Sequence, residues 1–228
     1  MSLLQSTLPG PLQVQADTAW ENILDRADPA TATRLQTSAQ ADPIASQLPR
    51  LLACSPFVVD LARRKPALLA DALDGSFLQA PMAEGQLREE LTGLLQAENA
   101  ELGPVLRQFR QRQMLRIIWR DFSRLADTLE TVRDTSLLAE ACIALALDYS
   151  HAAVEQRFGA PMGRDSGEPQ QMIVLGMGKL GARELNVSSD IDLIFAYPEA
   201  GMTNHEKRPI SNEEFFIKVG QGLITALD

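Results

Sequence analysis

The sequence predicts an α+β protein in which helices dominate and strands come late. Apolar residues recur at spacings of three and four through the first two-thirds of the chain, which is the period of an amphipathic helix. After a connection rich in glycine and proline at residues 159–169, the pattern changes to short apolar runs typical of strands. The length of 228 residues suffices for one large domain or two small ones with a substantial core.

Composition narrows the classes of protein to which the chain can belong. It has 21 basic and 30 acidic residues, a formal charge of −9, which argues against nonspecific binding to nucleic acid or to a membrane surface. No apolar run approaches the roughly 20 residues that span a bilayer, and residues 1–13 lack a basic segment and an apolar signal core. Cys54 and Cys142 lack metal-ligand spacing, and no disulfide is expected. We expect a cytoplasmic protein with no membrane or nucleic-acid partner.

The N-terminal part of the chain is predicted to form short helices separated by prolines. Residues 1–13 are expected to be irregular, and a helix at residues 17–26 carries an apolar face. Pro49 is expected to punctuate the chain. Ser55 is a predicted N-cap because Pro56 stands at the first helical position after it.

Longer helices are predicted in the middle of the chain. Leucines at helical spacing predict a helix over residues 84–99. Gly103 and Pro104 are expected to break the chain, and the next helix should reach about Leu129. A further helix is predicted from residue 134 to about residue 158.

Four arginines spaced by four lie on one side of the predicted helix that ends near Leu129. One interpretation is a solvated basic face with acid partners such as Asp121. The other is that some of them face an anionic partner or phosphates held by the next domain. The four are Arg112, Arg116, Arg120 and Arg124.

Residues 171–195 are the most informative stretch. An apolar strand runs to Gly176, a glycine turn follows, and a second strand opens with Asp190 and Asp192. Alternation along that strand would put both carboxylates on the same side, roughly 7 Å apart at their Cα atoms. Two carboxylates on one face suit a divalent metal. The apolar residues that follow predict a core strand with both faces buried, Ile194 facing the side opposite the aspartates.

The glycine turn has several interpretations. Gly176 to Gly181 fit the G-x-G-x-x-G pattern of a dinucleotide-binding fold. Only eight residues separate Gly181 from Asp190, whereas a crossover helix with its loops needs roughly 10 to 12. A phosphate-binding P-loop does not fit either, because Lys179 is followed by leucine.

A third interpretation explains the turn and the carboxylates together. Gly178 and Lys179 would hold a phosphate tail beside a metal on the two aspartates, and glycine would allow close approach of the backbone. A structural hairpin with solvated acids at its end stays open as the alternative. Arg183 and Glu184 are expected to form a surface ion pair.

The string GMGKLGARELNVSSDIDLIF, residues 176–195, resembles the signature of bacterial glutamine synthetase adenylyltransferases, also called adenylyl-removing enzymes. Residues 52–57 and 112–121 are similar to the helical region of the same family, so that the resemblance covers about residues 45–228. The family belongs to the polymerase-β-type nucleotidyltransferases. The resemblance therefore implies a helical region, residues 1–133, followed by the start of a nucleotidyltransferase mixed sheet in residues 134–228.

The sequence of residues 184–192 is similar to that of the first, deadenylylating half of proteins in that family. The resemblance implies that phosphate displaces a tyrosine of glutamine synthetase from AMP to give ADP, while a second half of the full enzyme adds AMP from ATP. It also implies Mg²⁺ as cofactor and the regulatory PII protein as a partner. Implied metal ligands and catalytic residues are Asp190 and Asp192, and the implied nucleotide-binding residues are Gly176, Gly178, Lys179 and Ser189.

Nucleotidyltransferases of this type resemble one another in a third carboxylate on a later strand. The acids that follow Asp192 have no strand context, so we expect a fragment that ends before this carboxylate and is inactive alone. Two alternatives to a nucleotidyl-transfer enzyme remain at this point. One is a noncatalytic helical interaction module that docks a partner through the arginines, and the other is a Rossmann-type dinucleotide-binding enzyme.

Overall fold

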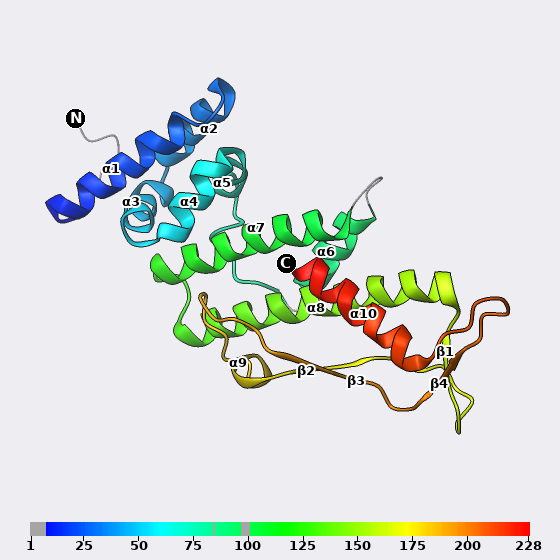
Figure 1. Ribbon diagram of the computed structural model, residues 1–228. Helices are drawn as coiled ribbons and strands as arrows, with labels where there is room; N and C mark the ends of the chain where they lie inside the picture. Colours follow the sequence, from blue (N-terminus) through cyan, green and yellow to red (C-terminus); the bar gives the residue numbers. More distant parts are fainter. Residues whose placement is uncertain (1–7, 84, 97–100) are drawn as a thin grey trace. The chain divides into compact units, whose positions relative to one another are not determined.

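The computed structural model describes residues 8–83, 85–96 and 101–228. The chain forms two compact units (Figure 1). Unit 1 combines the residues up to Met82 with Gln111–Thr131, and unit 2 combines Ala83–Arg110 with Val132–Asp228. The strands of the described residues all lie in unit 2. This mostly helical α+β composition confirms the predicted fold class.

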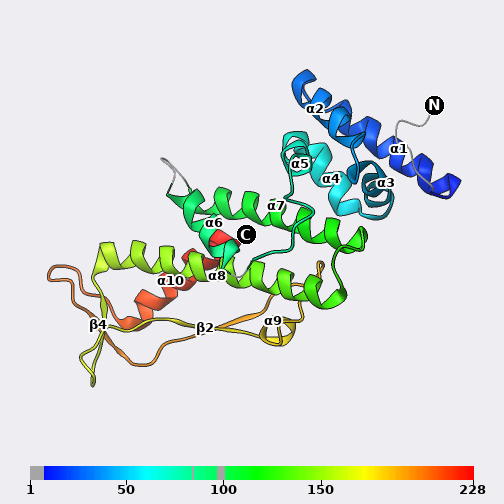
Figure 2. The same ribbon diagram turned by 180° about the vertical axis from the view of Figure 1, so that it is seen from behind.

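The described residues of unit 1 form five short helices and parts of two long ones. Helix α1 packs against α3 and α4, and α2 packs against α5 (Figure 2). Its core holds large apolar side chains with almost no exposed surface, among them Trp20, Leu48 and Trp119. The short helices are α1 (Gly10–Leu24), α2 (Pro29–Ala39), α3 (Ile44–Cys54), α4 (Pro56–Arg64) and α5 (Pro66–Leu73).

Prolines begin helices in unit 1 more often than they interrupt them. The hydroxyl of Ser55 accepts a hydrogen bond from the Val58 amide at 3.4 Å, which confirms the predicted N-cap of α4. Helix α1 begins at Gly10, directly after Pro9, so the irregular segment predicted up to residue 13 is too long. Its residues 1–7 lie outside the described residues. Pro49 is buried inside α3 and does not interrupt it.

Helix α7 contradicts the predicted break at Gly103 and Pro104. Both residues lie in its first turn, where the missing N–H of proline removes no helical hydrogen bond. The helix ends well before Leu129, because Asp127 caps the next helix by accepting the Glu130 amide at 2.7 Å. The other helices in this part of the chain are the short α6 (Gln86–Leu95) and the long α7 (Leu102–Phe122) and α8 (Thr128–Phe158).

Two of the four arginines in the predicted basic stripe are buried in α7, whereas Arg124 lies beyond the end of that helix and is exposed. Arg116 and Arg120 are only 2% and 3% exposed. Arg116 donates to two carbonyl oxygens of residues 77–80 at 3.1 and 2.7 Å, and Arg120 donates to a third. Arg120 also pairs with Glu130 at 2.7 Å. Both interpretations of the stripe are therefore wrong for these two arginines, which hold a segment of their own chain.

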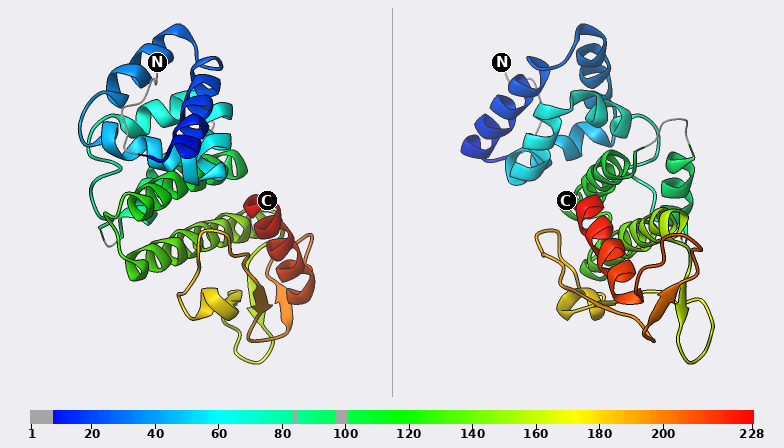
Figure 3. Two further views of the ribbon diagram at one scale, coloured as in Figure 1. Left: turned by 90° about the vertical axis from the view of Figure 1, so that its left-hand side faces the viewer. Right: turned by 45° about the vertical axis from the view of Figure 1, so that its right-hand side comes forward.

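In the part of unit 2 that the structure describes, there are two small antiparallel sheets, and α8 and α10 cover one side of them (Figure 3). Strand β1 pairs with β4, and β2 pairs with β3. The first pair is absent from the sequence prediction, which treated residues 159–169 as a connection. The elements are β1 (Pro161–Gly163), β2 (Ile173–Gly176), α9 (Gly178–Gly181), β3 (Leu193–Ala196), β4 (Gly201–Thr203) and α10 (Asn212–Leu227).

The core of unit 2 lies between the β2–β3 pair and the helices α8 and α10. Phe215, Phe216 and Val219 of α10 form its centre, and Val174 and Phe195 pack against them from the strands. By length and hydropathy alone α8 could cross a membrane, but core helices of soluble proteins meet the same criterion. The predicted domain boundary at residues 133 and 134 falls inside α8, close to where the chain enters unit 2 for the second time.

Candidate active site

The β2–β3 pair buries only one of its faces among the described residues. Val174 and Phe195 face each other and point to the core, while Leu175 and Ile194 form the neighbouring pair and are 49% and 47% exposed. Ile173, also in β2, is 46% exposed. The prediction of a core strand buried on both faces is therefore wrong for this part of the chain.

The antiparallel pairing of β2 with β3 contradicts the dinucleotide-binding interpretation. A Rossmann unit joins two parallel strands through a crossover helix. Here a single helical turn, α9, follows β2, and the described chain then runs without a helix from Ala182 to Asp192. The two strands are neighbours in one hairpin-like pair, as the short spacing between Gly181 and Asp190 indicates.

Two glycines allow the turn after β2 to close tightly. A Cβ on Gly181 would lie 2.5 Å from the carbonyl oxygen of Gly176, which is too close for any other residue. Gly178 has a left-handed φ of 53°, and open space surrounds the place where a side chain would be. The Met177 amide donates to the Asp192 carbonyl at 2.9 Å. The turn is therefore held directly against the residue that precedes β3.

The structure brings Lys179 and Ser189 together, two of the residues predicted to bind nucleotide. The Lys179 ammonium lies 3.4 Å from the Ser189 hydroxyl. That hydroxyl donates to the Asn186 side chain at 2.9 Å, and the Ser189 amide donates to the Asn186 carbonyl at 3.1 Å. Lys179 is exposed. A cation at the surface is thus placed beside a closed turn that leads directly into Asp190.

Asp190 and Asp192 lie just before β3 rather than in its first positions, because the strand begins at Leu193. Both are exposed. Within the described residues neither carboxylate has a hydrogen-bond or ion-pair partner, and no group of three potential metal ligands is found. Asp192 falls on the same exposed side as Ile194 in the alternation that continues from β3, so the prediction that Ile194 faces away from the aspartates is wrong for Asp192. The alternation predicted for Asp190 does not apply, since no strand covers it.

This donor set fits magnesium. Mg²⁺ prefers oxygen ligands and is usually bound by one or two carboxylates together with substrate phosphates. Two exposed carboxylates without partners among the described residues, the first of them directly after the serine that Lys179 contacts, meet that requirement. Asp190 and Asp192 are the residues that would hold the ion.

Helix α8 supplies contacts to this site that sequence reasoning missed. Arg183, with a left-handed φ of 57°, pairs with Glu140 of α8 at 2.9 Å. The predicted ion pair between Arg183 and Glu184 is therefore wrong. The Leu185 amide donates to the Ser136 hydroxyl at 3.1 Å. No local pattern could show these contacts, because the partners stand 43 and 49 residues apart.

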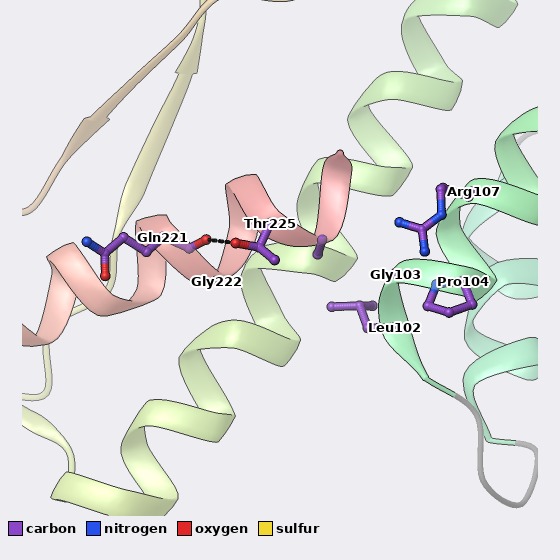
Figure 4. A pocket seen from close by; sticks show the side chains of 8 residues that line it. Leu102, Gly103, Pro104, Arg107, Gln221, Gly222 and Thr225 are labelled. Atoms are coloured by element: carbon purple, nitrogen blue, oxygen red, sulfur yellow. Dashed lines mark hydrogen bonds between the residues drawn. The ribbon is translucent and has the colours of Figure 1, made fainter.

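A separate hollow in unit 2, of about 500 Å³, contains none of the predicted site residues. It lies between the first turns of α7 and the C-terminal half of α10 (Figure 4). Arg107 supplies the charge among the described residues that line it, and the Thr225 hydroxyl donates to the Gln221 carbonyl at 2.8 Å.

A family model described as glutamate-ammonia ligase adenylyltransferase matches residues 45–228, which is most of the chain. The chain belongs to the glutamate-ammonia ligase adenylyltransferase family. This membership confirms the resemblance drawn from residues 176–195.

Curated relatives agree with the family assignment. A protein of Pseudomonas aeruginosa named bifunctional glutamine synthetase adenylyltransferase/adenylyl-removing enzyme is 49% identical over 96% of this chain and 22% of its own length. Proteins of the same name from Pseudomonas putida and Nitrosococcus oceani are 45% and 48% identical, over 99% and 76% of this chain and over 23% and 18% of their own lengths. The chain thus spans about a fifth of the length of these relatives.

Proposed function

We propose that this chain carries a nucleotidyltransferase site that acts on glutamine synthetase and removes AMP from an adenylylated tyrosine by phosphorolysis. The full-length enzyme would also add AMP from ATP. The observation that carries the proposal is the pair of exposed carboxylates, Asp190 and Asp192, beside the Lys179–Ser189 contact. The names of the relatives, which include both adenylyltransferase and adenylyl-removing enzyme, support it.

In the proposed reaction an oxygen of inorganic phosphate attacks the phosphorus of the AMP group. The bond from phosphorus to the tyrosine oxygen breaks, the tyrosine regains a proton, and ADP leaves. Phosphoryl and nucleotidyl transfer depend on positioning and on neutralising charge more than on covalent chemistry by the protein. Bound magnesium would neutralise charge on the transferring group and on the leaving oxygen.

Each residue of the candidate site has its own role in the proposed reaction. Asp190 and Asp192 hold the metal. Lys179 contacts phosphate oxygens with its ammonium, and the Gly178 backbone allows those oxygens to approach closely because no side chain intervenes. The Ser189 hydroxyl orients the lysine by accepting from its ammonium, while its own proton is donated to the Asn186 side chain. Gly176 shapes the turn, since a Cβ there would meet Leu180 at 2.8 Å.

A third carboxylate, which the family resemblance implies, is not found near the pair in the described residues. We therefore propose that residues 1–228 alone are inactive and that the longer enzyme supplies it. Glutamine synthetase as protein substrate, the PII protein as regulator and a cytoplasmic location remain proposals that rest on the resemblance.

The test uses adenylylated glutamine synthetase, phosphate, Mg²⁺ and the complete enzyme that contains these residues, with loss of AMP followed by intact mass. Wild-type enzyme should remove one AMP mass per subunit, and Asp192→Asn should not. Asp148→Asn is the matched control, because this exposed aspartate lies on α8 and pairs with Arg88 at 3.5 Å. Full activity of Asp192→Asn, or no activity of folded wild-type enzyme with its activators present, would refute the proposal and favour a noncatalytic docking module.

A further inference from the structure

We propose that Ser136 and Glu140 of α8 are positioning residues for the reaction proposed above, on which this inference rests. They hold the loop of residues 182–189, which joins the glycine turn to the two aspartates. Neither residue touches the carboxylates or Lys179 in the described structure. Their action on the site passes through the loop.

The contact to Ser136 is the stronger of the two. Ser136 has no exposed surface and Leu185 has 2%. The Ser136 hydroxyl donates to the Val132 carbonyl of its own helix at 2.8 Å, which leaves an oxygen lone pair for the Leu185 amide at 3.1 Å. A buried amide without an acceptor is costly. Loss of this oxygen would therefore force Leu185 away from the helix.

Glu140 holds the same loop two residues earlier. Both of its carboxylate oxygens accept from the Arg183 guanidinium, at 2.9 and 3.3 Å. The side chains of Glu140 and Arg183 are 37% and 66% exposed, so solvent screens this pair. We expect it to limit the motion of the loop more than to stabilise the unit.

A shift at Leu185 can reach Asp190, because the segment from Leu185 to Asp192 is held at both ends. Beyond Leu185, the Asn186 side chain accepts from the Ser188 amide at 3.1 Å and from the Ser189 hydroxyl at 2.9 Å. At the far end the Asp192 carbonyl accepts from the Met177 amide. With one end attached to α8 and the other to the turn after β2, a shift of Leu185 would be passed to Ser189 and Asp190. A misplacement of about 1 Å can reduce a rate by roughly a hundredfold.

The test compares Ser136→Ala with Ser150→Ala in the complete enzyme. Ser150 is a serine of the same helix, also buried, and no described hydrogen bond joins it to the loop. Ser136→Ala should lower kcat for phosphate-dependent AMP removal about tenfold, with little change in the KM for adenylylated glutamine synthetase, whereas Ser150→Ala should stay within about twofold. Ser136→Thr keeps the hydroxyl and should restore much of the loss.

A second comparison covers the case in which Ser136→Ala fails to fold. Glu140→Gln should lower kcat by a few-fold and Asp148→Asn should not, and reversal of the pair by Glu140→Arg with Arg183→Glu should recover activity relative to Glu140→Arg alone. Amide hydrogen exchange of residues 182–189 should quicken in the Ser136 and Glu140 variants and stay unchanged in the two controls.

The outcomes separate this inference from the proposed function. If Asp192→Asn is inactive but the Ser136 and Glu140 variants behave like their controls, the positioning role is wrong and the proposed function stands. A decrease in kcat that only matches a loss of folded protein would also overturn it. If Asp192→Asn remains active, the proposed function fails and the positioning role fails with it.

Discussion

Two segments of the molecule use charged side chains in opposite ways. Residues 77–80 of unit 1 are held by Arg116 and Arg120, which are buried and direct their donors at backbone carbonyl oxygens. The turn after β2 in unit 2 carries Lys179, which is exposed and has a single long contact at 3.4 Å. From the sequence, a binding role stayed open for the four arginines and was implied for Lys179. Burial separates the two cases, since a buried cation is already occupied by the protein.

The largest expected effect is the loss of stability on substitution of the buried Arg120. Arg120→Ala leaves Glu130 and the carbonyl oxygens of residues 79 and 125 without their donor. Breaking a buried, hydrogen-bonded ion pair costs about 3–5 kcal/mol, and denaturant titration of residues 1–228 should show a decrease of this size for unit 1.

Arg63→Ala is the control for that measurement, because its pair with Asp60 at 3.1 Å is exposed. It should change the free energy of unfolding by less than about 1 kcal/mol. Equal effects of the two variants would contradict the structural role given to Arg120.

Substitution of the exposed Lys179 should lower enzymatic activity and leave the stability of the protein unchanged. Lys179→Ala removes a surface cation with one weak contact, so the denaturation midpoint should hardly move. Phosphate-dependent AMP removal by the complete enzyme should fall about a hundredfold, the usual cost of losing one donor to a developing anion. Lys207→Ala, an exposed lysine in the loop after β4, is the control. A loss of stability with unchanged activity would place Lys179 in the same structural class as Arg120.

The reactivity of the two cysteines is a smaller test of the contrast between buried and exposed side chains. Burial raises the pKa of the Cys142 thiol from 9.0 to about 11, whereas Cys54 is exposed. A thiol reagent at pH 8 should modify Cys54 in the folded protein and Cys142 only after unfolding. Full modification of Cys142 in folded protein would show that α8 is less protected than the structure indicates.

The sign of the pH effect follows from the direction of that pKa shift. The folded protein keeps the Cys142 proton at pH values where the unfolded chain loses it, so this contribution to stability is complete below pH 9 and is lost as pH rises toward 11. Between pH 8 and pH 10 the wild type should lose about 1 kcal/mol more of its free energy of unfolding than Cys142→Ala does.

The sequence could predict features that depend on neighbouring residues. The cap at Ser55 and the end of β2 at Gly176 belong to this group, because they follow from local hydrogen bonding and spacing. The length of α7 was predicted wrongly, since its end depends on Asp127 and on a left-handed residue, Arg124, and apolar spacing shows neither. The open face of β2 and β3 was missed for a related reason, because apolar alternation does not tell which neighbours cover a sheet.

The sequence by itself determined the family and the mostly helical α+β class, and it predicted the candidate site residues. Its signature from Gly176 to Asp192 is long and specific, and the turn needs glycine where the backbone approaches itself. Only the tertiary structure decided which charges are occupied and which remain exposed, and that α8 holds the loop before Asp190. Burial and long-range hydrogen bonds join residues that lie dozens of positions apart, and no pattern in a single stretch of sequence contains that information.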